Sequence, residues 1–217
     1  MEELKTLARE LQGQGEVIPV WLDVANARKT LEIIRAIDDA CGGLDLVVAN
    51  AAVALETPGD APPWDAVEHM IDVNVRGAAA TLSAVADRMA SRGRGHLVGM
   101  SSLAAGRGAP RNSAYSASKA FLTTFLEGMR IDLAPRGVKV TTIHPGFVRT
   151  PGTAGNAFKM PFLLELDDAV ERIGRAILRG TSELSFPWQS AMVVKLSRLL
   201  PNALWDRAAR SLGPGRD

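Results

Sequence analysis

The 217-residue chain has an ordinary globular composition, with 47% apolar and 23% charged residues and a formal net charge of +1. The near-neutral charge, with no basic stripe interleaved with aromatic residues, argues against a nucleic-acid-binding protein. One cysteine excludes an intramolecular disulfide, no apolar run approaches the ~20 residues that span a bilayer, and the first residues do not resemble a signal peptide. We therefore expect one cytoplasmic domain over residues 1–217.

The pattern of apolar residues predicts strands that alternate with helices. Unbroken apolar runs predict strands at 17–22, 44–49, 96–101, 138–144 and 183–186, and helical spacing predicts helices at 2–12, 26–41, 64–92, 113–134 and 167–179. Strands that are apolar throughout and separated by helices indicate an α/β fold with a parallel sheet covered on both faces. Ligands of such sheets bind at the carboxyl ends of the strands, so functional residues are expected just after them.

Tyr115 and Lys119 lie four residues apart on the predicted helix at 113–134 and therefore project from one face. A phenol titrates near ~10, and a neighbouring ammonium lowers that pKa toward the range of a general acid or base. Ser102 follows the strand at 96–101, where its hydroxyl can bond a substrate oxygen. The plainer alternative, a surface pair of helix residues, is disfavoured because Ser102 and the PGFVRT turn lie in register with the pair.

Other polar residues follow the predicted strands as well. Three of them come after a strand: Asp23, Asn50 and the rigid turn PGFVRT (145–150). Asn74 lies within the helix predicted at 64–92. Asp23 could simply terminate its strand, and Asn74 could be a helix-surface amide; both alternatives stay open.

Two further sets of residues are predicted to be structural. His69, His96 and His144 have no spacing that makes a metal site. The paired Asp38 and Asp39 are interpreted as helix-surface charges rather than a catalytic dyad.

Five ordered motifs together resemble the short-chain dehydrogenase/reductase family. They are Asp23-Val24, Asn50-Ala51-Ala52, Asn74 in DVNVRGA, Ser102 thirteen residues before Tyr115 and Lys119 in AYSASKAF, and PGFVRT. The resemblance runs from the N-terminus to about residue 150. It implies a Rossmann-like doubly wound parallel sheet and an oxidoreductase that transfers a hydride between NAD or NADP and a ketone, aldehyde or alcohol.

The resemblance also implies roles for individual residues. Tyr115 would be the acid/base, Ser102 would steady the substrate oxygen, Lys119 would lower the tyrosine pKa and hold the nicotinamide ribose, and Asn74 would support a water relay. The implied cofactor contacts are Asp23, Val24, Asn50, Ala51, Tyr115, Lys119, Pro145, Gly146, Val148 and Thr150.

The chain departs from the family pattern at its beginning. The 217 residues contain no glycine-rich TGxxxGxG turn between a strand and a helix, and Gly13-Gln14-Gly15 is no substitute because it follows a helix and precedes a strand. The chain thus resembles a family domain that lacks its first two strands and first helix. We expect that Met1 is an internal or misassigned start, and that two absent strands would lie between 17–22 and 44–49.

By the same resemblance, 151–166 forms a lid over an apolar substrate, and the chain forms a homodimer or homotetramer. The tail at 186–217 is expected to pack beside the substrate pocket or a subunit, with contact to a membrane surface as a less favoured alternative. The rival function is a shortened, non-catalytic relative that acts as a binding or oligomerisation partner. An epimerase or dehydratase of the extended branch is a third alternative, for which the C-terminal part leaves little room.

Overall fold

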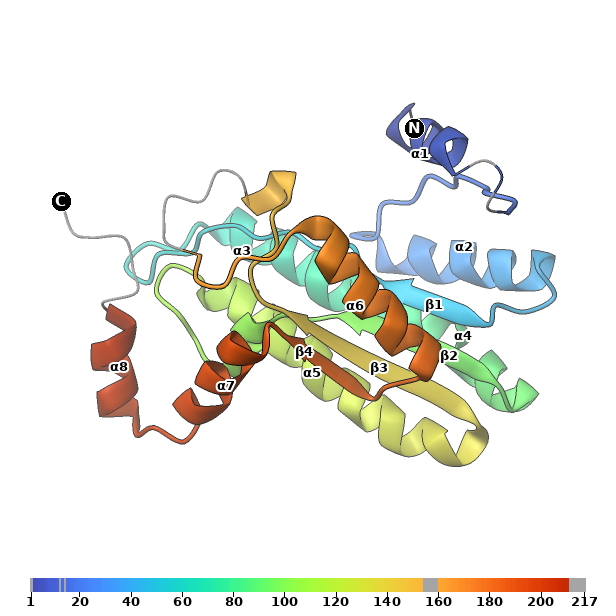
Figure 1. The fold of residues 1–217 in the computed structure, drawn as a ribbon. Helices are drawn as coiled ribbons and strands as arrows, with labels where there is room; N and C mark the ends of the chain where they lie inside the picture. The colour runs from blue at the N-terminus through green and yellow to red at the C-terminus, as the bar shows by residue number, and fades with distance from the viewer. Residues whose placement is uncertain (1, 12, 14, 154–159, 211–217) are drawn as a thin grey trace.

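In a computed structural model that describes residues 2–11, 13, 15–153 and 160–210, the chain forms a four-stranded parallel sheet with helices on both faces (Figure 1). The strands, in their order across the sheet, are β1 (Leu46–Ala49), β2 (Gly95–Met100), β3 (Val138–Pro145) and β4 (Glu183–Phe186). The α-helices are α1 (Glu2–Glu10), α2 (Ala27–Ala40), α3 (Trp64–Met70), α4 (Ala78–Arg92), α5 (Ser113–Leu133), α6 (Leu166–Arg179), α7 (Trp188–Ser197) and α8 (Asn202–Arg210). The predicted α/β class and parallel, Rossmann-like sheet are confirmed.

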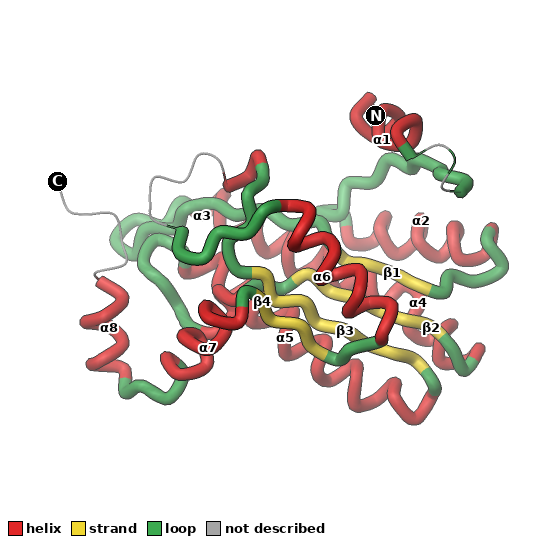
Figure 2. The backbone as a smooth tube through the Cα atoms, in the orientation of Figure 1, coloured by secondary structure: helices red, strands yellow, loops and turns green. Residues whose placement is uncertain are grey.

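Different helices cover the two faces of the sheet (Figure 2). On one face Val47 and Leu97 belong to a core with α4 and α5, and on the other Val98 belongs to a core with α6. Successive strand residues point to opposite faces, which explains why Leu97 and its neighbour Val98 enter different cores. Val48 pairs in register with Val98 and points to the α6 face, yet it is 40% exposed.

The strand predicted at 17–22 is wrong. Residues 16–23 join none of the described strands, and Ile18 and Trp21 are 69% and 62% exposed. A segment becomes a strand only when a neighbour takes up its backbone hydrogen bonds, so an apolar run alone does not suffice. Among the described residues β1 is therefore the edge of the sheet, next to this unpaired segment.

A π-helical turn interrupts the long helix predicted at 64–92. It spans Ile71–Gly77, between the end of α3 and the start of α4. At Gly77 an added Cβ would lie 2.7 Å from the carbonyl oxygen of Val24, so a side chain there would push the two segments apart. Such π turns inside helices often mark functional sites, and this one carries Asn74.

The interpretation of Asp38 as a helix-surface charge is wrong, because its side chain is buried between α2 and α4. Its carboxylate accepts hydrogen bonds from Arg88 at 3.2 Å, from Arg92 at 3.1 Å and from the backbone N–H of Leu44 at 2.6 Å. Burial alone would raise the pKa of Asp38, but these hydrogen bonds, that of Arg92 first, lower it to about 2. The neighbouring Asp39 is exposed and pairs with Arg88.

The predicted lid and tail are described in part. Residues 154–159 of the lid, which include Phe158, lie outside the described residues. Beyond them, Leu164 forms a parallel bridge with Val148 and packs against the core under α6. The tail forms α7 and α8 as far as Arg210. No described helix is long and apolar enough to cross a membrane, and the described residues contain no cluster of three or more metal-ligating side chains.

Candidate active site

The carboxyl ends of β1, β2 and β3 meet at one edge of the sheet, because these strands are parallel and in register (Figure 1). Asn50 follows β1, Ser102 lies two residues past β2, and Gly146 follows β3. Residues far apart in the sequence are thereby brought to the carboxyl ends of the strands, where ligands of parallel sheets bind.

Ser102 is held by the backbone on either side of it. Its hydroxyl oxygen accepts a hydrogen bond from the N–H of Ala104 at 3.1 Å and so caps the 3₁₀ turn Leu103–Gly106. Its carbonyl oxygen lies 3.3 Å from Nδ1 of His144, which can donate to it. Ser101, one residue earlier, donates its Oγ–H to the carbonyl of Lys119 at 3.0 Å and thus ties the end of β2 to α5.

Tyr115 lies in the first turn of α5, near Ser102. Burial raises the pKa of the Tyr115 phenol above its ordinary value, and a hydrogen bond with Ser102 offsets part of that rise. The sequence-based expectation of a phenol pKa lowered by Lys119 therefore differs from the structure, in which desolvation is the larger effect.

Lys119 is one helical turn further along and only 3% exposed. Its Nζ lies 5.6 Å from the centre of the Tyr115 ring and donates a hydrogen bond to the carbonyl of Met100 at 2.8 Å. Burial lowers the pKa of Lys119 to about 8. An ammonium has three N–H donors, so this group has hydrogen-bonding capacity beyond its bond to Met100.

Asn74 reaches from the π-helical turn to two other segments. Its Oδ1 accepts from the N–H of Val53, and its Nδ2 donates to the carbonyl of Val53, both at 2.8 Å. Nδ2 also donates to Ser118 Oγ at 3.1 Å, and Ser118 in turn donates to the carbonyl of Tyr115 at 2.8 Å. Asn74 is 1% exposed, so its side chain links the loop after β1 to the helix turn that carries Tyr115 and Lys119.

A hollow of about 200 Å³ lies between the unpaired segment before α2 and the exposed edge of β1. Its lining includes three of the predicted cofactor contacts, Val24, Asn50 and Ala51, together with Gly77 of the π-helical turn. Asp23 has a local role as well: its Oδ1 accepts a hydrogen bond from the N–H of Ala25 at 3.0 Å and closes a turn.

The PGFVRT turn (145–150) is fixed by hydrogen bonds at both ends. Gly146 donates its N–H to the carbonyl of the last β4 residue at 2.7 Å. Thr150 donates its N–H to Thr153 Oγ1 at 2.9 Å, and that hydroxyl donates to the carbonyl of Val148 at 2.7 Å. The turn therefore has a defined backbone conformation beside the strand ends.

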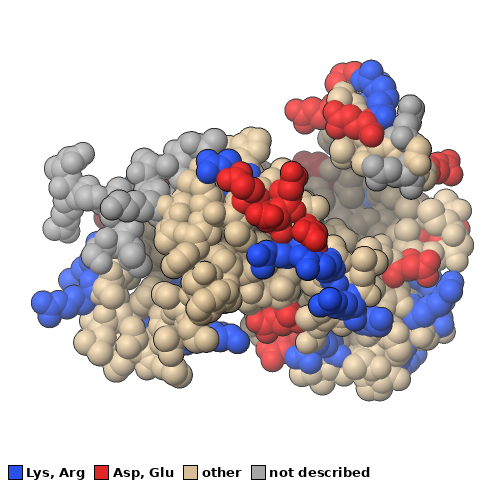
Figure 3. Space-filling model, in the orientation of Figure 1, with Lys and Arg blue, Asp and Glu red and all other residues tan. Residues whose placement is uncertain are grey.

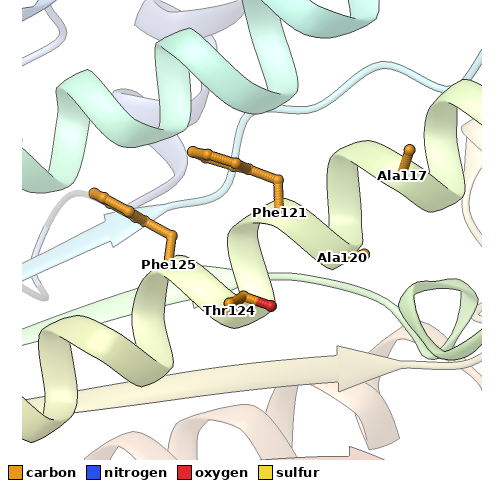
Figure 4. Close-up of a pocket in the computed structure, with 5 residues that line it drawn as sticks. All are labelled: Ala117, Ala120, Phe121, Thr124 and Phe125. Atoms are coloured by element: carbon orange, nitrogen blue, oxygen red, sulfur yellow. The ribbon is translucent and has the colours of Figure 1, made fainter.

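A larger, open hollow of about 520 Å³ lies along α5 (Figure 4). The rings of Phe121 and Phe125 stack in it with their centres 5.5 Å apart. The lining residues are Ala117, Ala120, Phe121, Thr124 and Phe125. Its lining is almost wholly apolar and contains neither Tyr115 nor Lys119. We therefore separate it from the candidate active site.

Sequence reasoning missed the contacts of two residues. Ser118 bridges Asn74 and Tyr115; its position three residues after Tyr115, on the same helix face, was a usable signal. His144 was predicted to be structural, and its contact is with the backbone of Ser102. His96 is structural in the core, where its Nε2 lies 2.7 Å from Thr141 Oγ1.

Comparisons with known proteins match the chain to one family. A family model described as short chain dehydrogenase matches residues 1–159. An uncharacterized oxidoreductase from Myxococcus xanthus is 55% identical over 213 residues, which cover 98% of this chain and 84% of that protein. An uncharacterized oxidoreductase from Staphylococcus aureus is 36% identical over 157 residues, which cover 70% of this chain and 66% of that protein.

A solved structure has the same fold. The crystal structure of a short chain dehydrogenase from Burkholderia cenocepacia in complex with NADP is 22% identical, has a TM-score of 0.74, and is matched over 91% of this chain and 81% of its own. At this identity the likeness shows the fold alone. The family match and the two relatives extend it to a general oxidoreductase role. The chain belongs to the short chain dehydrogenase family.

Proposed function

We propose that the chain is an NAD- or NADP-dependent oxidoreductase that interconverts an apolar ketone or aldehyde with the corresponding alcohol. The observation that carries this proposal is the placement of the Tyr115 phenol beside Ser102 and beside the buried ammonium of Lys119, whose Nζ lies 5.6 Å from the centre of the Tyr115 ring. The three groups lie at the strand ends, where ligands of parallel sheets bind.

Tyr115 is the general acid and base of this proposal. Because burial raises its pKa, the phenol holds its proton at neutral pH and can donate it to the oxygen of a carbonyl substrate. Ser102 donates a hydrogen bond to the same oxygen and keeps it within reach of the phenol. The bound nicotinamide cofactor supplies a hydride to the carbonyl carbon in reduction and accepts one from the alcohol in oxidation.

Lys119 and Asn74 support the reacting groups. The ammonium of Lys119 has N–H donors beyond its bond to the Met100 carbonyl, and we assign them to hydroxyl groups of the nicotinamide ribose. Asn74 is assigned as a positioning residue, since its side chain holds the loop after β1 and, through Ser118, the carbonyl of Tyr115. The water relay that the family resemblance implies is proposed to run beside Asn74.

The hollow beside β1 fits the adenosine end of a dinucleotide. Val24 and Ala51 offer it an apolar wall, and Asn50 offers an amide for hydrogen bonding. Asp23 is proposed at its rim, and Pro145, Gly146, Val148 and Thr150 at the nicotinamide end. Among the described residues ahead of β1 no strand leads through a glycine-rich turn into a helix, so no residue is assigned to the pyrophosphate. The NADP bound to the Burkholderia relative supports the choice of a nicotinamide nucleotide.

Apolar side chains also support the proposed substrate and assembly. Met160 and Leu163 in the predicted lid at 151–166 favour an apolar substrate. The exposed Phe121 and the half-buried Phe125, whose rings stack, form an apolar face on α5 that suits the pairing of subunits in a homodimer or homotetramer.

Replacing Tyr115 with phenylalanine tests the proposal. Tyr115→Phe removes the proton donor and keeps the ring, so turnover of apolar ketones and aldehydes should fall about 10²–10⁴-fold while the cofactor Kd stays unchanged. Turnover is followed by the absorbance of the reduced cofactor, and Kd by titration with NADH and NADPH. Ser91→Ala, which removes an exposed hydroxyl on α4, is the matched control and should change neither quantity.

Two results would contradict the proposed role. An equal loss of cofactor binding and turnover in Tyr115→Phe would make the tyrosine a binding residue instead of the proton donor. If the 217-residue chain neither binds a nicotinamide nucleotide nor turns over any substrate of the panel, the rival function as a non-catalytic binding or oligomerisation partner is favoured.

A further inference from the structure

Helix α7 is apolar on two opposite sides, and the fold uses only one of them. On the inner side Ala191 is buried, and Val194 lies against Gly106 so closely that an added Cβ there would be 2.1 Å from its methyl group. This contact seats α7 on the 3₁₀ turn that Ser102 caps. A helix on the surface of a protein normally turns a polar side to solvent, so the exposed apolar side of α7 requires an explanation.

The outer side of α7 continues into α8 as an exposed apolar stripe, here called the α7–α8 stripe. On α7, Trp188, Met192 and Leu196 follow each other at intervals of four residues, so they lie on one helix face. Leu199 is 80% and Trp188 is 71% exposed, although single exposed apolar residues elsewhere on a surface need no explanation. The stripe consists of Trp188, Met192, Val193, Leu196, Leu199 and Leu204.

The two helices that carry the stripe are fastened to the body of the protein. Arg107 donates hydrogen bonds to the carbonyl of Ser197, the last residue of α7, at 2.8 Å and to that of Leu200, in the link to α8, at 2.9 Å. It also donates to Asn202 Oδ1 at 2.9 Å, and its guanidinium lies 5.2 Å from the centre of the Trp205 ring on α8. The stripe is therefore presented in a fixed arrangement.

The charges around the stripe have one dominant sign. Residues 187–210 contain four basic side chains and a single acidic one, Asp206. In the space-filling view, the surface over α7 and α8 is largely tan, with blue and no red on it (Figure 3). The basic residues are Lys195, Arg198, Arg207 and Arg210, all exposed.

We propose that the α7–α8 stripe docks on the surface of an anionic lipid bilayer, with its apolar residues among the acyl chains and its basic residues at the lipid phosphates. Short helices with leucine and tryptophan on one side and lysine and arginine beside them bind membranes in this way. The helices project from the body of the protein (Figure 1), which suits insertion into a deformable layer. A second copy of the chain fits less well, because a twofold contact would set basic residues against basic residues.

Flotation with lipid vesicles tests the proposal on the whole chain. The protein should float with vesicles of phosphatidylcholine and phosphatidylglycerol, and far less with phosphatidylcholine alone or at high salt. Leu196→Glu, at a 57% exposed position of the stripe, should lower partitioning about tenfold or more. Leu178→Glu makes the same change at an 86% exposed position on α6 and should leave partitioning unchanged. The double variant Lys195→Glu with Arg207→Glu should weaken binding to anionic vesicles only.

Other outcomes would overturn the proposal. One is an unaltered chain that stays with the soluble fraction in the presence of anionic vesicles. Another is an equal loss of flotation in Leu196→Glu and Leu178→Glu, which would place the contact elsewhere. A dimer that dissociates in Leu196→Glu, measured by light scattering on a sizing column without vesicles, would assign the stripe to a second copy of the chain.

Discussion

Tyr115 is the only tyrosine of the chain, so its ionisation can be measured without interference from another phenol. Because burial raises its pKa, we expect the cofactor-free protein to form tyrosinate only above the ordinary value of about 10. The hydrogen bond with Ser102 works in the opposite direction, so Ser102→Ala should raise the pKa further. Difference absorbance during a pH titration measures both values.

Ser91→Ala is the control for that titration, since its hydroxyl is exposed on α4 and should not affect the midpoint. A midpoint below the ordinary value would mean that a nearby positive charge outweighs burial in the protein alone. A lower midpoint in Ser102→Ala would contradict the hydrogen bond between the two hydroxyls. The first result would return the site to the expectation drawn from the sequence, in which Lys119 lowers the phenol pKa.

The candidate site was predictable where its residues share one local element. Tyr115 and Lys119 are one turn apart on a single helix, and Ser102 follows a strand, so the pattern was enough to select them. The contact of His144 was not predictable, because its partner is the backbone carbonyl of Ser102, which lies 42 residues away and leaves no mark on the sequence. The direction of the Tyr115 pKa was missed for a related reason: burial depends on packing by the whole fold.

The junction of α2 and α4 depends on the buried carboxylate of Asp38. The pKa of Asp38 is lowered to about 2 in the folded chain, below the ordinary value of 3.8. The ionised carboxylate therefore stabilises the fold above pH ~4, and this contribution is lost as the pH falls through 2. We expect Asp38→Asn to lower the free energy of unfolding at pH 7 by about 1–2 kcal/mol and to flatten its dependence on pH between ~4 and ~2. Urea unfolding at several pH values measures this.

The neighbouring Asp39→Asn is a matched control, because Asp39 also pairs with Arg88 but is 68% exposed in its side chain. Exposed ion pairs contribute little, so its effect should stay within about 0.5 kcal/mol. If the two variants lost the same stability, burial of Asp38 would not be the cause.

Helices and strands were predictable from the sequence to the extent that their own residues determine them. The four strands of the sheet and the main helices follow from apolar runs and helical spacing, which are local. The segment 17–22 has the same apolar pattern, but none of the described strands pairs with it. The π-helical turn at Ile71–Gly77 was not predicted, because the apolar residues around it still follow a helical spacing.

Within the described part of the molecule, the sheet is open on the β1 side, next to an extended segment with exposed apolar residues. An unpaired strand edge with apolar side chains is a template for pairing with other chains. Val47 and Val48 are successive residues of β1, yet Val47 is 7% exposed in the core and Val48 is 40% exposed. A substitution at Val48 therefore tests the exposed face of β1, and the same substitution at Val47 tests the core.

We expect Val48→Lys to slow aggregation on warming, because a charge on an open edge discourages intermolecular strand pairing. Its free energy of unfolding should change by no more than about 0.5 kcal/mol, since the lysine side chain can extend into solvent. Val47→Lys should instead lower stability by more than about 3 kcal/mol, because it places a charge in the core with α4. Light scattering during a thermal ramp and urea unfolding measure the two effects. If Val48→Lys aggregated as fast as the unaltered chain, association would begin elsewhere than at the β1 edge. If Val48→Lys lost as much stability as Val47→Lys, the face of β1 that carries Val48 would be covered in solution.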